Sequence, residues 1–99
     1  RVTSQDEIAA IDGVLSRGAI AAIDLAAQEG ALAANAVERY QVEKVNYVAK
    51  QEKEDAVSYF AIVRLNDNED ANTKEQIGYV IDQNNDSEDL TLRAYKVRN

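Results

Sequence analysis

The stretch Ala56-Val-Ser-Tyr-Phe-Ala-Ile-Val-Arg-Leu-Asn66 decides the fold class of this 99-residue chain. Its aliphatic and aromatic residues alternate at a spacing of two, as in a β-strand whose side chains point to two faces. One face carries Val57, Tyr59, Ala61, Val63 and Leu65, and the other carries Phe60 and Ile62. A strand that is apolar on both faces is typical of the centre of a sheet, so we expect this strand to be central.

Three more segments have strand-like spacing, and they cover residues 39–50, 76–83 and 90–97. In the first of them the apolar phase slips at Glu43-Lys44, which predicts a bulge or a sharp bend. No helical stretch separates the strands. The connections therefore predict an antiparallel meander rather than parallel crossovers.

The N-terminal third of the chain has a different period. Residues 4–37 are rich in alanine and carry isoleucine and leucine at helical spacing, with Ile8, Ile11 and Leu15 on one face. A helical region followed by strands predicts the α+β class. We expect a single domain over residues 1–99, in which one N-terminal helix, or a broken pair, packs on a four-stranded antiparallel sheet.

Local signals indicate where the helices begin and end. Ser4 and Glu7 have the spacing of a capping box, and Arg17-Gly18 has the cation and the glycine typical of a helix end. Gly30 would mark a bend in the second helical segment, because glycine disfavours a helix interior. Residues 1–18 would then be an N-terminal helical extension, and residues 19–99 would hold the second helix and the sheet.

The chain contains no cysteine and no histidine. Their absence excludes disulfides, thiolate or imidazole metal sites, and catalysis by Ser-His-Asp or Cys-His sets. Acid–base chemistry would depend on Asp, Glu, Lys or Tyr, and no catalytic signature stands out among them. We therefore expect a protein that is not an enzyme, with no catalytic residue, no cofactor and no metal ion.

The formal net charge is −7. An acidic chain repels phosphates and anionic lipids, so the expected partner is a basic protein surface rather than nucleic acid or a membrane. No apolar run of ~18 residues could span a bilayer. The chain begins at Arg1 and contains no methionine, which removal of an export signal would explain, as would cloning. Export and a cytoplasmic location both stay open, as does the oligomeric state.

Two segments resemble the cystatin/monellin family. Residues 55–65 are similar to the second-strand motif of cystatins, in which a small and a polar residue precede Tyr-Phe and alternating aliphatic residues. Leu90–Lys96 is similar to their last strand, and the bent segment 40–49 stands where cystatins have a bulged strand after the helix. The resemblance covers about residues 19–99 and implies a helix packed on a four-stranded antiparallel sheet.

The inhibitory motifs of cystatins are missing from this chain. Inhibitory members carry Gln-Val-Val-Ala-Gly as an apolar wedge for papain-like proteases, and this chain has Glu52-Lys-Glu-Asp-Ala56 at that place. A charged turn cannot supply the buried apolar contact of such a wedge. The Pro-Trp of the second inhibitory loop is also missing, because the chain has neither residue. The comparison with cystatins therefore implies the fold and argues against papain-type inhibition.

Acidic residues gather in three polar loops, at 50–56, 66–75 and 83–89. We consider seven of them candidate interaction residues: Glu52, Glu54, Asp55, Asp67, Glu69, Asp70 and Asp86. Asp82, Asn84 and Asp86 have the opening spacing of a calcium loop, but Ser87 and Arg93 stand where that loop needs glycine and glutamate. We interpret this segment as a hairpin turn, because Asn and Asp favour turns.

Three functions stay open, and the preferred one is a small acidic binding or accessory protein that acts through these charged loops. The first alternative is a cone-shaped α+β module that binds a small ligand or catalyses a reaction. Its tyrosines would line a pocket with a buried carboxylate; the candidates are Tyr40, Tyr47, Tyr59, Tyr79 and Tyr95. The second alternative is an oligomeric structural subunit, which would expose apolar surface on the helix at 4–17.

Overall fold

The computed structural model describes residues 4–73 and 75–98 and confirms the α+β class. Helices α1 (Gln5–Ala10) and α2 (Asp12–Gln28) come first, and the short helix α3 (Ala36–Arg39) leads into the sheet. Four strands follow, namely β1 (Tyr40–Glu52), β2 (Ala56–Asp67), β3 (Gln76–Asn84) and β4 (Leu90–Arg98). The predicted strands match these within two residues at every end.

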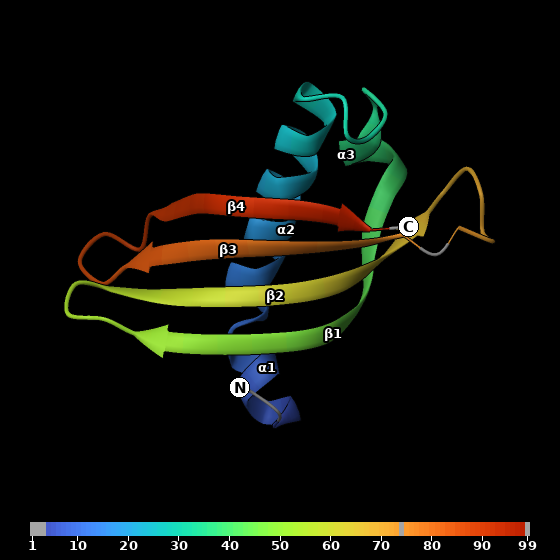
Figure 1. The fold of residues 1–99 in the computed structure, drawn as a ribbon. Coiled ribbons are helices and arrows are strands. Elements are labelled where there is room, and N and C mark those ends of the chain that lie inside the picture. The colour runs from blue at the N-terminus through green and yellow to red at the C-terminus, as the bar shows by residue number, and fades with distance from the viewer. Residues whose placement is uncertain (1–3, 74, 99) are drawn as a thin grey trace.

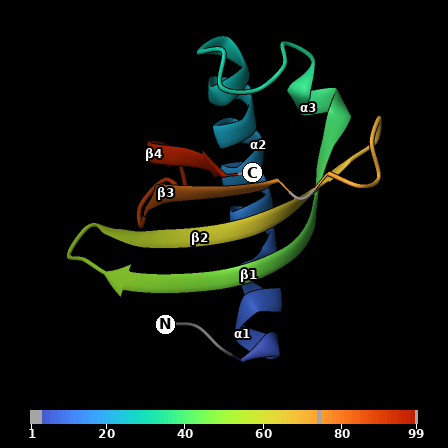
Figure 2. The ribbon, with the colours of Figure 1, turned by 45° about the vertical axis from the view of Figure 1, so that its right-hand side comes forward.

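The strands form an antiparallel meander in the order β1-β2-β3-β4 (Figure 1). β2 therefore lies inside the sheet, as predicted. The register of β1 against β2 shifts between Val42 and Lys44, which confirms the irregularity expected at Glu43-Lys44, and shifts again between Val45 and Tyr47. Such irregularities bend a strand, and β1 curves visibly between α3 and the β1–β2 turn (Figure 2).

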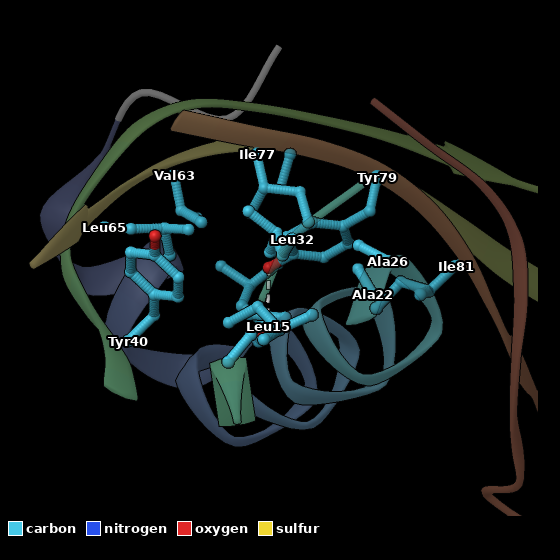
Figure 3. Close-up of a cluster of buried hydrophobic side chains, with 14 of the residues drawn as sticks. Leu15, Ala22, Ala26, Leu32, Tyr40, Val63, Leu65, Ile77, Tyr79 and Ile81 are labelled. Atoms are coloured by element: carbon cyan, nitrogen blue, oxygen red, sulfur yellow. Dashed lines mark hydrogen bonds between the residues drawn. The ribbon is translucent and has the colours of Figure 1, made fainter. Parts of the chain in front are cut away.

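Helix α2 crosses one face of the sheet, here called the inner face, and the strands run in front of it in Figure 1. The buried side chains of α2 are small or aliphatic, and the inner positions of β2 and β3 supply larger ones (Figure 3). Tyr79 is 1% exposed, and its hydroxyl donates to the carbonyl oxygen of Leu15 at 2.7 Å. The most completely buried large side chains are Tyr79, Leu65, Ile77, Ile81, Val48 and Val63.

Gly18 lies in the middle of α2, so the helix end predicted at Arg17-Gly18 is wrong. A Cβ atom on Gly18 would approach Ile81 Cδ1 to 2.6 Å and Tyr79 Cε2 to 2.9 Å. The helix therefore passes too close to β3 for a side chain at this position. Packing on the sheet outweighs the cost of about 1 kcal/mol that glycine brings to a helix interior.

The helical region is broken at Ile11, between α1 and α2, rather than at residue 18. The proposed boundary between an extension and the rest of the domain therefore falls inside one continuous helix. The side chain of Ser4 makes no capping hydrogen bond, in contrast to the predicted capping box. Gly30 lies beyond the last helical residue, Gln28, with a φ of 80°, so it helps to end α2 and does not bend it.

No helix in residues 4–73 and 75–98 has the combination of length and apolar character needed to cross a membrane.

The opposite side of the sheet, here called the outer face, has no helix packed on it in the described chain (Figures 1 and 2). The alternation predicted for β2 is confirmed, because Tyr59, Ala61, Val63 and Leu65 are buried on the inner face. Phe60, however, is 40% exposed. α2 covers only one of the two apolar sides of β2, so the side that carries Phe60 is open to solvent.

Replacement of Gly18 by alanine should destabilise the protein, although alanine favours helices. Overpacking against Ile81 and Tyr79 is expected to cost about 1–3 kcal/mol and to exceed the gain of about 1 kcal/mol in helix propensity. Gly13, in the same helix, provides the matched control, because a Cβ atom added there would have no atom within 4 Å. Gly13→Ala should raise the free energy of unfolding in urea, and a rise for Gly18→Ala as well would contradict the close contact.

Leu65 and Phe60 should differ strongly in their contribution to stability. Leu65 is 0% exposed, so Leu65→Ala should lower the free energy of unfolding by about 2–5 kcal/mol. Phe60→Ala should cost well under the roughly 3–5 kcal/mol typical of a fully buried ring, because much of its surface already faces solvent. Chemical denaturation of the two variants gives the comparison. Equal losses would mean that the outer face is covered in solution.

Candidate functional site

The seven candidate acidic residues lie at two opposite ends of the sheet (Figure 1). The end formed by the β1–β2 and β3–β4 turns holds Glu52, Glu54, Asp55 and Asp86. The end formed by α3 and the β2–β3 loop holds Asp67, Glu69 and Asp70. The fold thus divides the candidates into two groups with different surroundings.

The first end is a continuous surface, here called the acidic edge, made of residues 52–55 and 84–89. Ala56 of β2 and Asn84 of β3 are register partners, and the Asn85 amide donates to the Asp55 carbonyl oxygen at 3.0 Å. These backbone contacts hold the two turn tips side by side. The edge presents six exposed carboxylates, on Glu52, Glu54, Asp55, Asp86, Glu88 and Asp89.

Asn84 organises the β3–β4 turn within the acidic edge. Its side-chain oxygen accepts hydrogen bonds from the amides of Asp86 at 2.8 Å and Ser87 at 3.2 Å. This is the local contact of an Asx turn, and it supports the interpretation of the segment as a hairpin turn. Glu88 completes the turn in a left-handed conformation, with a φ of 61°. Among residues 4–73 and 75–98, no group of three or more acidic side chains is placed to hold a metal ion.

The prediction that Asp67, at the opposite end, is an exposed loop residue is wrong. Asp67 is the last residue of β2 and is 2% exposed. Its two carboxylate oxygens accept hydrogen bonds from Nε and Nη2 of Arg39, both at 2.8 Å. The amide of Glu69 donates to the same carboxylate at 2.9 Å, and the hydroxyl of Thr73 donates to it at 3.3 Å. Asp67 therefore ties α3 to the β2–β3 loop.

This bonding also shifts the ionisation of both partners. The hydrogen bonds from Arg39 hold the pKa of Asp67 well below its usual range, and the hydrogen bond to Asp67 raises the pKa of Arg39. The pair stays charged at any ordinary pH, so it is unsuited to proton transfer. Glu69 joins the same structural cluster, because its carboxylate accepts a hydrogen bond from the side-chain amide of Asn35 at 3.1 Å.

Three of the tyrosine hydroxyls lie beside separate parts of the chain. Tyr79 donates to the backbone of α2 at Leu15, and Tyr95 donates to the carboxylate of Glu29 beyond the end of that helix. Burial, and then the nearby carboxylate of Glu75, raises the pKa of Tyr40 to about 12. A tyrosine-lined catalytic pocket would need several tyrosines around a buried carboxylate. These three tyrosines are not arranged around one carboxylate.

Two features of the structure were missed in the sequence. The Arg39–Asp67 pair joins residues 28 positions apart, and no local pattern distinguishes these two from the exposed charged residues of the chain. The uncovered outer face had a signal, because Phe60 and Ile62 make β2 apolar on both sides. That pattern predicts a central strand, and the fold leaves one side of this strand open.

Comparisons with protein-family models, with curated proteins and with solved structures find no match to this chain.

The pairing of Asp67 with Arg39 should make stability depend on pH in the acidic range. A carboxyl whose pKa is lower in the folded state stabilises the fold above its unfolded value of roughly 4, and this contribution is lost as the pH falls towards the folded pKa. Asp67→Asn should therefore lower the melting temperature at pH 7, and its difference from wild type should shrink steadily below about pH 4.

Asp86→Asn provides the matched control, because Asp86 is exposed and belongs to the acidic edge. Its melting temperature should follow that of wild type across the pH range. If Asp67→Asn and wild type differed by a constant amount from about pH 7 to about pH 2.5, the low pKa of Asp67 would be refuted.

Proposed function

We propose that this protein is a small non-enzymatic binding protein whose acidic edge contacts a basic surface on a protein partner. The placement of the β1–β2 and β3–β4 turns side by side, with the Asn85 amide bonded to the Asp55 carbonyl oxygen, is the observation that carries this proposal. Short turns fixed by backbone hydrogen bonds lose little freedom on binding. Grouped carboxylates also attract a basic partner over a distance and orient it.

The resemblance to cystatins supports the same location for the binding surface. When residues 55–65 are aligned with the second-strand motif of cystatins, residues 52–56 stand at the place of the first inhibitory hairpin, and residues 52–55 belong to the acidic edge. We propose that the edge is used for binding here as well, with charge in place of the apolar wedge. Papain-like proteases are then not targets, because the residues from Glu52 to Asp55 are exposed and charged.

The alternatives have less support. The enzymatic or small-ligand module would need a buried carboxylate in a pocket lined by tyrosines, and Tyr40, Tyr79 and Tyr95 have different neighbours. The oligomeric subunit would need apolar surface on the helix at 4–17. Ile8, Ile11 and Val14 instead pack against the core.

Neutralising the acidic edge should abolish capture of a basic partner. The test compares immobilised wild type with the variant Glu54→Gln/Asp55→Asn/Asp86→Asn/Glu88→Gln in an extract of the source organism, at low and at high salt. The matched control, Asp6→Asn/Glu7→Gln/Asp12→Asn/Asp24→Asn, removes the same charge from exposed positions on the helices. Surface charge pairs of this kind are sensitive to salt.

We expect wild type and the helix variant to retain the same basic proteins, and the edge variant to retain at least tenfold less of them. Equal loss in both variants would show that net charge alone is responsible and would refute the acidic edge. Inhibition of papain by the wild-type protein would refute the proposed departure from cystatin function.

A further inference from the structure

The outer face of the sheet is apolar at its centre. Phe60 and Val80 are register partners across β2 and β3, and Val80 pairs with Ala94 of β4. In the next row Ile62 pairs with Gly78. The Phe60 ring is braced by Tyr47 of β1, with 5.7 Å between the ring centroids. This row of apolar residues departs from the usual pattern, because a sheet solvated on one side commonly alternates apolar and polar positions.

Two hollows lie on this face, on either side of a ridge formed by Phe60 and Val80. The first has a volume of about 200 Å³ and reaches over Ile62, Gly78 and Ala94. The second has a volume of about 170 Å³ and reaches over Ala49 and Ser58. The first hollow exists because two small residues, Gly78 and Ala94, stand among larger ones.

Basic residues surround both hollows. Lys96 and Arg98 line the first hollow, and Arg93 lines the second. Arg64 and Lys44 are register partners at the same side of the sheet. The carboxylates of Glu43 and Asp82 lie within ion-pair distance of Arg64 and Arg93 respectively. Within the described chain, no carboxylate lies within ion-pair distance of Lys96 or Arg98, although the protein as a whole carries a net charge of −7.

From this combination we propose that the outer face is a second binding surface, for an acidic protein segment that inserts an apolar side chain between carboxylates. The apolar side chain fills the hollow over Gly78, and the flanking carboxylates contact Lys96 and Arg98. This is the arrangement of a buried anchor within a polar rim that gives protein interfaces most of their affinity. The inference is independent of the acidic edge, which has the opposite charge and lies at the end of the sheet.

The dimensions of the hollows favour a protein segment over other occupants. Small-molecule pockets have volumes of roughly 300–1,000 Å³ and enclose most of their ligand, whereas the hollow over Gly78 holds about 200 Å³. That space suits one leucine or phenylalanine side chain. A second copy packed face to face would bring the basic residues of both copies together, and like charges across an interface are unfavourable.

The proposal can be tested with synthetic peptides and isotope-labelled protein. The probe is a ten-residue peptide with one central phenylalanine flanked by glutamates. One control peptide replaces the phenylalanine with alanine, and a second replaces the glutamates with lysines. Amide shifts in NMR spectra, recorded with peptide up to about 1 mM, locate the contact and give its affinity.

Two protein variants separate the contribution of the apolar anchor to binding from that of the basic residues around the hollow. Gly78→Leu fills the hollow, and it should fold normally because a Cβ atom at this position has its nearest neighbour at 3.7 Å. Lys96→Glu/Arg98→Glu reverses the charge of the rim. Gly13→Ala, a change in open space on α2, is the control variant.

We expect the glutamate–phenylalanine peptide to shift amides of β2, β3 and β4 on the outer face, and binding to weaken as salt is raised. Both outer-face variants should reduce affinity at least tenfold, and Gly13→Ala should leave it unchanged. Absence of shifts, equal binding of the lysine peptide, or unchanged binding by Gly78→Leu would overturn the proposal. A dimer of the wild-type protein, seen as a doubled molecular mass and abolished by Gly78→Leu, would also overturn it. Stronger binding of the protein to anionic vesicles than to the peptide would overturn it as well.

Discussion

The close contact of α2 with β3 determines the rest of the architecture. Gly18 lets the helix backbone approach Ile81 and Tyr79, and the Tyr79 hydroxyl then reaches the carbonyl oxygen of Leu15. The small residues that follow along the buried side of α2 are Ala19, Ala22 and Ala26. A helix with these residues can lie close to the sheet, and the larger side chains of the strands fill the space around it. The sheet therefore supplies most of the large side chains of the core, and the helix supplies most of the small ones.

A single helix of this length covers one face of a four-stranded sheet and leaves the other face to solvent. The outer face nevertheless carries Phe60, Ile62 and Val80 near its centre, with basic residues around them. Most acidic residues lie on the helices and in the loops at the two ends of the sheet, whereas Glu43 and Asp82 lie beside Arg64 and Arg93. A chain with a net charge of −7 thus presents one face that is rich in basic residues, and the electrostatic potential of this face differs from that of the acidic edge.

The two ends of the sheet also differ in kind. At one end the carboxylate of Asp67 is buried against Arg39 and fixes α3 to the β2–β3 loop. At the other end the carboxylates are exposed, and backbone hydrogen bonds, rather than ion pairs, hold the turns together. An exposed carboxylate keeps its charge available for a partner, whereas a buried one stabilises the fold by its contacts. The same residue type therefore has a structural role at one end and is available for binding at the other.

The sequence by itself determined that helices precede four strands, the approximate ends of the strands, the bulge in β1 and the alternation of side chains along β2. These properties depend on the spacing of neighbouring residues, and that spacing is visible along the chain. Only the tertiary structure decided that Gly18 continues a helix, because the reason lies in Ile81 and Tyr79, about sixty residues further along the chain. It also decided that Asp67 is buried and that Phe60 is not. Whether a charged side chain is paired, or an apolar side chain is buried, depends on which distant elements pack against it. The local sequence does not specify those elements.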